Sequence, residues 1–554
     1  MHMKKYYFLI FVALIIGIFL RIRHIDQAPV SLFGDEIDVG LQAYSILTTG
    51  KDYLSNSYPV IFHSFSEYRL PMQLYLAVPF IKVFGLNEMG VRAAAVLMGF
   101  ASIAAIYLLT RELFGKRVAA IASIFMSFSP WHFNFSRQAN DAGIILPFII
   151  LGTYFFVKAK ENFKYLIFSA ISFCLSIYTY AIASLFVPLF VLLLLLVFRK
   201  EIFAYGLKKL ALVAVCTLIL LSPYIGKTLA GYTIRRASDI RLLTRNEIEG
   251  KVVEGRGTTS GFLGRLYYNK ATVIGNSFFE NYTQALSPFF LFARGDPNSR
   301  HSITGFGLMY FFDFIFIILG LSLLPLWINQ KKYNLLLIAF WLILSPLPSM
   351  VTKGGGMHAA RLILLMPPLI IFSALGFSRL LEISKRFIGK AIIVIVLITM
   401  IFEVSRFMNQ YFNFWPKYSW RNWQYGFEQM LGYVKNEDKN YDRIIFNNTY
   451  EPMLPRFMFY YAYDMALFQK QFTADVHSPA IIPGLDGFKL GQKYYFGDLK
   501  KPIENIGQTG TLVVASAEKD ATNPLIFEGK DLKLLTTIKS PENTDIFYIF
   551  SASD

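Results

Sequence analysis

The stretch KYLIFSAISFCLSIYTYAIASLFVPLFVLLLLLVFRK, residues 164–200, decides the class of fold. No charged side chain occurs between Lys164 and Arg199, and basic residues stand at both ends. A membrane-spanning helix needs about 20 mainly apolar residues. We therefore predict two spans in this stretch, centred near Phe173 and Val191.

The whole chain shares this apolar character. Of its 554 residues, 55% are hydrophobic and only 16% are charged, and the mean hydropathy is +0.44, values outside the range of soluble globular domains. The net charge of +17 does not indicate nucleic-acid binding, because no binding motif accompanies it. Cys174 and Cys216 both lie in apolar runs, which excludes a disulfide framework and a cysteine-based zinc site.

Nine further runs have the length and composition of a span, which gives eleven in total. The first extends from Tyr6 to Leu20 between basic residues and lacks the small-residue cleavage pattern of a signal peptide. The other eight are centred near Met98, Ile124, Ile150, Ala214, Ile317, Ile338, Ile371 and Val396.

The segment Pro71–Leu86 is short and contains Lys82, so loop charge decides its status. If it does not span, eighteen Lys and Arg residues fall in short loops on one side of the membrane, and only Arg137, Lys353 and Arg361 fall in those on the other. A twelfth span would invert every later loop and break the positive-inside rule. We predict that this segment is a helix lying in the interface.

The same charge pattern predicts a multi-pass protein of the plasma (inner) membrane with a cytoplasmic N-terminus. Residues 1–408 then form an all-α polytopic membrane domain, with a first outer loop over 22–91 and a second long outer loop over 225–305. Residues 409–554 form a small extracytoplasmic α/β domain. Its predicted helices are Trp423–Lys435 and Pro455–Gln469, and its predicted strands are Arg443–Asn447, Thr511–Ser516 and Asp545–Ser551.

Three outer segments carry polar residues that hydropathy does not require. The first is Gly34-Asp35-Glu36-Ile37-Asp38, which precedes a stretch with helical spacing. Acidic residues in a first turn commonly cap a helix, and that role alone would account for them. The functional alternative is that one carboxylate, partly desolvated near lipid, takes a proton from an acceptor hydroxyl or amine.

The second segment is Ser136-Arg137-Gln138-Ala139-Asn140-Asp141, at the outer end of the third span. A helix cap with a snorkelling arginine is one interpretation. The other is that Asp141 orients the acceptor or shares a proton with the first acidic pair, while Arg137 binds a phosphate.

The third group combines two loops, Gly295–His301 and Lys353–Arg361. The first contains Asp296, Arg300 and His301, and the second contains three glycines, His358 and Arg361. A guanidinium suits bidentate phosphate binding, and glycines let backbone N–H groups approach an anion. Contacts of boundary arginines with lipid headgroups are the alternative.

The order and spacing of several motifs resemble glycosyltransferases of the protein O-mannosyltransferase and lipid A aminoarabinose transferase superfamily. These motifs are Gly34-Asp35-Glu36, Arg69-Leu70-Pro71, Asn87 to Arg92 and Arg137 to Asp141. The resemblance covers most of the membrane region. It implies the C-type glycosyltransferase fold, with juxtamembrane helices in the first outer loop, and polyprenyl-phosphate sugars as donors.

The resemblance also implies roles for single residues. It makes Asp35 the catalytic base and Asp141 the second acidic residue of the site, while Asp296–His301, His358 and Arg361 look like motifs of bacterial members. Residues 225–305 leave no room for the β-trefoil domains of eukaryotic relatives, and a WWD-type motif is missing from the C-terminal region. Acceptors of three kinds therefore stay open: glycolipid, cell-envelope polymer and protein.

We predict an inverting membrane glycosyltransferase of the hexosyl or pentosyl, mannosyltransferase-like kind, which uses a polyprenyl-phosphate sugar at the outer face. Asp35 deprotonates the acceptor, and Glu36 and Asp141 position or tune it. The predicted substrate-binding residues are Arg69, Arg137, Asp296, Arg300, His301, His358 and Arg361. No cofactor is predicted, and no metal, because His63 and Glu67 in the first loop are too loosely spaced to define a site.

Two rival hypotheses remain. A transporter or flippase of a lipid-linked substrate would place ionisable groups near the bilayer midplane and often has repeated halves, whereas the predicted spans are nearly free of Asp and Glu. The second rival hypothesis is a binding protein whose C-terminal domain is the active part. Deleting Asn409–Asp554 is expected to separate an enzyme from this binding protein.

Overall fold

The computed structural model describes residues 2–64, 68–232, 241–259, 261–329, 333–384, 387–447, 453–471, 488–497, 508–517 and 532–552. The chain forms two compact units, each built from separated segments. Residues 1–23 and 95–410 form the membrane unit, and residues 24–94 and 411–554 form the mixed unit. The division expected from the sequence, at 408/409, differs from this one because the first outer loop packs with the C-terminal segments.

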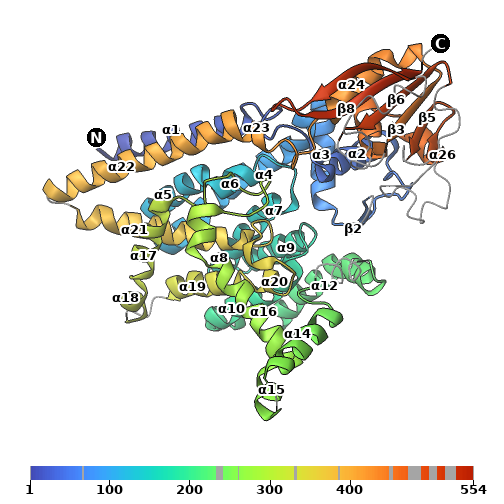
Figure 1. Cartoon of the computed structure of the whole chain (residues 1–554). Helices are drawn as coiled ribbons and strands as arrows, with labels where there is room; N and C mark the ends of the chain where they lie inside the picture. Colours follow the sequence, from blue (N-terminus) through green and yellow to red (C-terminus); the bar gives the residue numbers. More distant parts are fainter. Residues whose placement is uncertain are drawn as a thin grey trace. The chain divides into compact units, whose positions relative to one another are not determined.

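Each of the eleven predicted centres of a span lies in a helix (Figure 1). The helices are α1 (His2–Ile22), α4 (Glu88–Phe114), α5 (Lys116–Phe128), α8 (Leu146–Lys158), α9 (Lys164–Ile177), α10 (Ala183–Val197), α12 (Leu207–Leu229), α17 (Phe311–Leu321), α19 (Tyr333–Leu344), α21 (Met366–Ile383) and α22 (Phe387–Asn409).

Six stretches of the described residues are long and apolar enough to cross a membrane. The chain is therefore a multi-pass membrane protein. The count of eleven spans stays a prediction, because α9 and α10 have only 14 and 15 residues, fewer than the about 20 that a straight span needs. The six stretches are Glu88–Phe114, Asp141–Lys158, Leu207–Leu229, Tyr333–Met350, Ile363–Ile383 and Gly389–Tyr418.

Glycines allow a close backbone contact between two helices of the membrane unit. A Cβ added to Gly376 on α21 would lie 1.9 Å from the carbonyl oxygen of Phe316 on α17, and one on Gly320 would lie 2.2 Å from that of Phe372. Small residues of this kind let membrane helices approach backbone to backbone. The pair α17 and α21 therefore depends on both glycines.

The described residues of the mixed unit form a six-stranded sheet in the order β4-β5-β3-β6-β8-β7. Strand β3 pairs in parallel with β5 and β6, and the other pairs are antiparallel. The three predicted strands are confirmed as β3, β6 and β8. The strands are β3 (Arg443–Asn447), β4 (Phe488–Leu490), β5 (Tyr494–Gly497), β6 (Thr511–Ser516), β7 (Leu532–Lys539) and β8 (Asp545–Ala552).

The predicted helices of this unit needed correction. Pro455–Gln469 is two helices, α25 (Met453–Tyr461) and α26 (Met465–Gln471), because Ala462 adopts a φ of 49° between them. The helix predicted from Trp423 begins later, as α24 (Phe427–Glu437), since Gln424 and Gly426 have φ values of 53° and 105°. A residue with positive φ cannot continue a right-handed helix.

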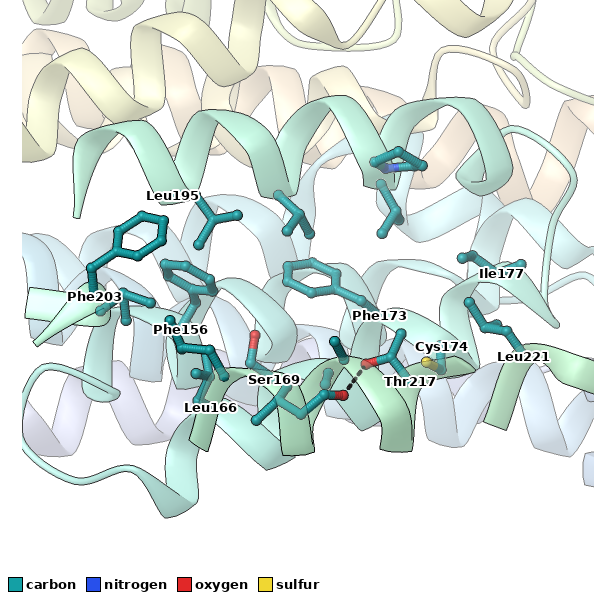
Figure 2. Close-up of a pocket in the computed structure, with 18 residues that line it drawn as sticks. Phe156, Leu166, Ser169, Phe173, Cys174, Ile177, Leu195, Phe203, Thr217 and Leu221 are labelled. Atoms are coloured by element: carbon teal, nitrogen blue, oxygen red, sulfur yellow. Dashed lines mark hydrogen bonds between the residues drawn. The ribbon is translucent and has the colours of Figure 1, made fainter. Parts of the chain in front are cut away.

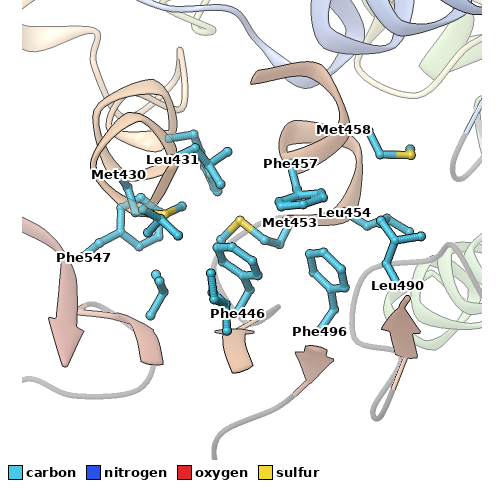
Figure 3. Close-up of a cluster of buried hydrophobic side chains, with 14 of the residues drawn as sticks. Met430, Leu431, Phe446, Met453, Leu454, Phe457, Met458, Leu490, Phe496 and Phe547 are labelled. Atoms are coloured by element: carbon cyan, nitrogen blue, oxygen red, sulfur yellow. The ribbon is translucent and has the colours of Figure 1, made fainter. Parts of the chain in front are cut away.

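The core of the mixed unit lies between the sheet and helices α24 and α25 (Figure 3). Met430 and Leu431 from α24 and Phe457 from α25 pack over Phe446 of β3 and Phe496 of β5. Because side chains alternate along a strand, Ile445 points to the other face of the sheet, where it packs with Val513 and Phe550.

The first outer loop contributes two helices to the mixed unit, α2 (Gly34–Thr49) and α3 (Met72–Phe84), and a short antiparallel pair, β1 (Phe62–His63) and β2 (Tyr68–Arg69). The segment predicted to lie in the interface is α3, a helix of 13 residues. At 1.5 Å per residue it is about 20 Å long, too short to cross the hydrocarbon core of about 30 Å.

Candidate active site

The first predicted motif lies at the start of α2, where Asp35 is exposed. The N–H of Gly34 donates to Oε1 of Gln424 at 2.9 Å, which satisfies one of the donors that a helix start leaves without an intrahelical partner. Nη1 of Arg69 donates to the backbone carbonyl of Asp35 at 2.8 Å. The backbone around Asp35 is thus held from two directions while its carboxylate stays exposed.

Glu36, the second acid, is buried in an ion pair with Arg92. Nε and Nη2 of Arg92 donate to Oε1 and Oε2 of Glu36 at 3.0 and 2.8 Å, a bidentate arrangement. Arg92 is fully buried and also donates to the carbonyls of Ile25, Pro29 and Ser31. This pair anchors the start of α2 to the start of α4.

Asp38, one turn after Asp35, is a buried carboxylate to which the sequence assigned no role of its own. Its Oδ2 lies 3.3 Å from Nη1 of Arg69. Burial raises the pKa of Asp38 to about 6, although the charge of Arg69 opposes the shift. The available sequence signal was the i, i+3 spacing from Asp35, which places both acids on one side of the helix.

The hydroxyl of Tyr53 lies 3.1 Å from Nδ1 of His63 in the same unit. Glu67, the other residue weighed for a metal in this loop, lies outside the described residues.

In the membrane unit, Arg137 is fully buried and binds backbone. Its Nη1 donates to the carbonyls of Leu20 and Arg21, both at 2.7 Å, at the C-terminal end of α1, where carbonyl groups lack helical partners. Arg21 in turn donates to Oγ of Ser136 at 3.0 Å. The contacts of Arg137 thus fasten α1 to the segment that contains Asp141, and phosphate binding by Arg137 stays a prediction.

The second and third predicted segments meet at the carbonyl of Arg300. Nδ2 of Asn134 and Nε2 of Gln138 donate to it at 3.0 and 2.9 Å. Asp141 begins the short helix α7 (Asp141–Ile144) three residues after Gln138 and is mostly buried, with 8% of its surface exposed. The membrane unit therefore brings these two motifs together, whereas the sequence predicted only that they lie on the same side of the membrane.

Asp296, His301 and His358 form a buried cluster in the same unit. Oδ2 of Asp296 accepts from Nδ1 of His301 at 2.9 Å and from the N–H of Ala359 at 2.7 Å. Oδ1 accepts from the N–H of Asn298 at 2.8 Å. The rings of His301 and His358 have their centroids 5.0 Å apart.

The protonation states in the cluster follow from this geometry. Burial lowers the pKa of His358 to about 3, and the neighbouring His301 and Arg361 act in the same direction. Burial by itself would raise the pKa of Asp296, but the hydrogen bond and charge of His301 outweigh it, so that the pKa is lowered. At neutral pH the cluster holds an ionised carboxylate beside a neutral His358.

Arg361 and the glycines shape the second loop of the cluster. Nη1 of Arg361 donates to Oγ1 of Thr352 at 2.9 Å and to the carbonyl of Lys353 at 3.0 Å. A Cβ on Gly355 would lie 1.9 Å from the carbonyl oxygen of Ser349, and one on Gly356 would lie 2.5 Å from Oε1 of Gln284. The glycines thus permit close packing within the protein, which is a structural reason for their presence.

The ten predicted site residues are divided between the units. Asp35, Glu36 and Arg69 belong to the mixed unit, and the other seven belong to the membrane unit. Cooperation between Asp35 and Asp141 therefore stays a prediction. The sequence did not predict the ion pairs of Asp38 with Arg69 and of Arg92 with Glu36. The second pair forms only because the start of α4 packs against the start of α2.

The chain is similar to a known protein family and to solved structures. Residues 68–226 match the model of the family described as dolichyl-phosphate-mannose-protein mannosyltransferase. No match was found among curated proteins. Crystal structures of ArnT from Cupriavidus metallidurans, in the apo state and bound to undecaprenyl phosphate, have TM-scores of 0.55 and 0.54 at 12% identity. Both comparisons cover 99% of this chain and 98% of ArnT.

The chain has the C-type glycosyltransferase fold. The oligosaccharyltransferase of Archaeoglobus fulgidus tethered with an acceptor peptide is also similar, with a TM-score of 0.50 and 14% identity over 100% of this chain and 74% of that one. The fold expected from the resemblance is thus confirmed.

In this C-type glycosyltransferase fold, the membrane unit contains an apolar cavity of about 440 Å³ (Figure 2). Helices α9, α10 and α12 supply most of its lining, including Phe173, Val191 and Leu221. Its few polar side chains include Ser169 and Thr217, whose hydroxyls donate to the carbonyls of Gly152 and Val213. The cavity therefore suits a hydrocarbon chain.

Proposed function

We propose that this protein is a membrane glycosyltransferase that moves a sugar from a polyprenyl-phosphate donor to an acceptor at the outer face of the membrane. The observation that carries the proposal is the full-length similarity to ArnT, one structure of which holds undecaprenyl phosphate. The matched mannosyltransferase family model over residues 68–226 supports the same class of reaction. The proposed acceptors are a cell-envelope glycolipid, a polymer or a protein.

Asp35 is the proposed general base. Its carboxylate takes the proton of the acceptor hydroxyl or amine as the acceptor atom bonds to C1 of the sugar. The bond from C1 to the phosphate oxygen breaks, its electron pair leaves with the polyprenyl phosphate, and the configuration at C1 inverts. Exposure of Asp35 beside the buried Glu36 and Asp38 supports this choice among the three acids. Asp141 is proposed to orient the acceptor.

The proposed phosphate contacts come from the membrane unit. Arg300, His301, His358 and Arg361 are the residues that we assign to the departing lipid phosphate, whose charge a guanidinium and imidazole N–H groups stabilise. Glu36 and Arg69 are proposed to act through position, because Glu36 pairs with Arg92 and Arg69 holds the backbone carbonyl of Asp35. Arg137 is proposed to contact the phosphate in addition to the end of α1 that it holds. The apolar cavity is the proposed place for part of the lipid tail.

The test is transfer of radiolabelled sugar from a panel of synthetic polyprenyl-phosphate sugars by purified protein in lipid. Asp35→Asn should lower turnover by about 10²- to 10⁴-fold, the usual contribution of a general base. Asp26→Asn is the matched control, because Asp26 is an exposed acid of the same segment, and it should keep wild-type turnover. The panel also identifies the sugar, mannosyl, other hexosyl or pentosyl.

Normal turnover of Asp35→Asn would show that Asp35 is not the general base, while the protein would still be a glycosyltransferase. A folded wild type that neither transfers sugar nor hydrolyses any donor of the panel would contradict the class itself and favour the transporter.

A further inference from the structure

Asp296, His301 and His358 bring three metal-ligating side chains to one point of the membrane unit. One donor atom of each residue lies within 4.8 Å of the others. The residues come from two loops that are far apart in the sequence. The N–H of Ala359 in one loop donates to Asp296 in the other, across 63 positions. The convergence is thus a product of tertiary packing.

The cluster is a built arrangement, held by its own surroundings. Oγ of Ser302 donates to the carbonyl of Asp296 at 2.7 Å. Gly295 adopts a φ of 70°, and a Cβ there would lie 2.8 Å from the side chain of Ser302. The ring of Phe135 packs at 5.7 Å from that of His301. Ligands fixed in this way lose little conformational entropy when they bind an ion.

The hydrogen bonds leave electron pairs for a cation. The carboxylate of Asp296 accepts three N–H groups of the described residues, from Asn298, Ala359 and His301, and an ionised carboxylate has about four lone-pair positions. The proton between Nδ1 of His301 and Oδ2 of Asp296, which lie 2.9 Å apart, is the one that an ion would replace, with His301 then protonated on Nε2. Nδ1 of His358 accepts from the N–H of Arg361 at 3.4 Å, a contact longer than an ordinary hydrogen bond and therefore weak enough to give way to an ion.

We propose that Asp296, His301 and His358 bind one divalent transition-metal ion of the zinc class, with a fourth position open. Two imidazole nitrogens and one carboxylate oxygen are a ligand set that Zn²⁺ takes in catalytic sites, where a water or a substrate completes the tetrahedron. Bond lengths of about 2.0–2.1 Å separate tetrahedral ligand atoms by about 3.3 Å. The donor atoms therefore need to move together by no more than about 1.5 Å from their present separation.

The open position would let the ion bind the donor phosphate, a role that depends on the proposed glycosyl transfer. An oxygen of the donor phosphate occupies it, and the charge of the ion stabilises the electron pair that leaves C1 of the sugar with the phosphate. Asp35 still takes the acceptor proton, so the ion adds to the base. Without an ion, His301 and His358 would contact the phosphate only through their N–H groups.

The experiment measures metal uptake in the absence of any donor, so its result is independent of sugar transfer. Full-length protein without a polyhistidine tag is placed in nanodiscs, treated with a chelator and titrated with ZnCl₂, and bound zinc is counted by mass spectrometry. Wild type should bind one ion per chain. His358→Gln and Asp296→Asn should weaken binding at least tenfold.

His24→Asn is the matched control. It also removes a histidine, but His24 is exposed and has a φ of 48°, a conformation that asparagine tolerates. This variant should bind zinc as wild type does. Titration of wild type with CoCl₂ needs no variant and should give the visible absorption of tetrahedral cobalt.

Wild type that takes up no zinc, His358→Gln that binds as tightly as wild type, or a cobalt spectrum equal to that of the aqueous ion would each overturn the site. A short-chain polyprenyl phosphate added to the cobalt form then tests the open position. A changed spectrum supports binding of the phosphate to the ion. An unchanged spectrum contradicts this binding but not the metal site.

Discussion

At the scale of single residues, the buried charges of the first motif have structural partners. Glu36 pairs with Arg92 and Asp38 pairs with Arg69, whereas Asp35 leaves its carboxylate exposed. The three acids lie within one turn of α2, yet their surroundings give them different chemistry. Their substitution should therefore have different effects on stability and on turnover.

Glu36→Ala should destabilise the protein strongly, because it leaves the fully buried guanidinium of Arg92 without its counter-charge. Removing one partner of a buried ion pair typically costs about 3–5 kcal/mol. Thermal unfolding should show a fall in Tm, with turnover falling in parallel. Glu254→Ala, on an exposed acid of α14 (Arg245–Thr258), is the control. An unchanged Tm with lost turnover would instead assign Glu36 a direct catalytic role.

Asp38 should make stability depend on pH. Its folded pKa, raised to about 6 from 3.8 by burial, means that the folded state binds the proton more tightly than the unfolded state. The stabilisation by protonation is therefore complete below the unfolded pKa of 3.8 and is lost as pH rises from there through 6. Two pKa units correspond to about 3 kcal/mol.

Asp38→Asn removes this dependence, since its amide has no charge to bury. As pH rises from 4.5 to 7.5, the Tm of the variant should rise relative to that of wild type. Differential scanning calorimetry measures both Tm values. A Tm difference that is constant over this range would mean that the carboxyl of Asp38 does not titrate there.

At the scale of elements, the helix that carries Asp35 is supported by the C-terminal segments. Gln424 accepts the N–H of Gly34, and Nε2 of Gln469 on α26 donates to the carbonyl of Asp52 at 2.8 Å. Helix α2 also packs on α25, where Gly40 permits the approach. The C-terminal region thus acts as a scaffold for α2.

Gly40→Ala should disturb this contact. The added Cβ would lie 2.4 Å from the ring of Phe459 and 2.8 Å from Val91, and overpacking of this kind costs about 1–3 kcal/mol. Gly432→Ala on the exposed side of α24 meets no atom of the described residues within 4 Å and should stabilise by about 0.5–1 kcal/mol. Thermal unfolding compares the two, and equal Tm changes would contradict the close contact.

At the scale of the whole molecule, each unit is assembled from segments that are distant in the chain. The larger hydrophobic cluster of the mixed unit includes Leu41 and Tyr53 of the first outer loop together with Phe427, Phe457 and Phe496 of the C-terminal region. Neither part can bury its apolar surface alone.

Deletion of residues 411–554 should therefore abolish turnover, although the proposed base is in the first loop. Limited proteolysis should cut the region 24–94 in the truncated protein and spare it in the full chain. The same deletion cannot separate an enzyme from a binding protein, because it removes the support of α2. Turnover near wild type in the truncated protein would contradict the shared core.

The sequence by itself predicted the membrane class, the positions of eleven helices and the strands β3, β6 and β8, and the resemblance to a known family predicted the fold. Long apolar runs and short runs of β-branched and aromatic residues are local patterns, so they are visible without packing. Only the tertiary structure decided which charges are paired, since Glu36 and Arg92 are 56 positions apart and no spacing links them. It also joined the first loop to the C-terminal region, across the 417 positions between Asp52 and Gln469, and brought His358 to Asp296. Burial and contact, which depend on the whole fold, assign these side chains their chemistry.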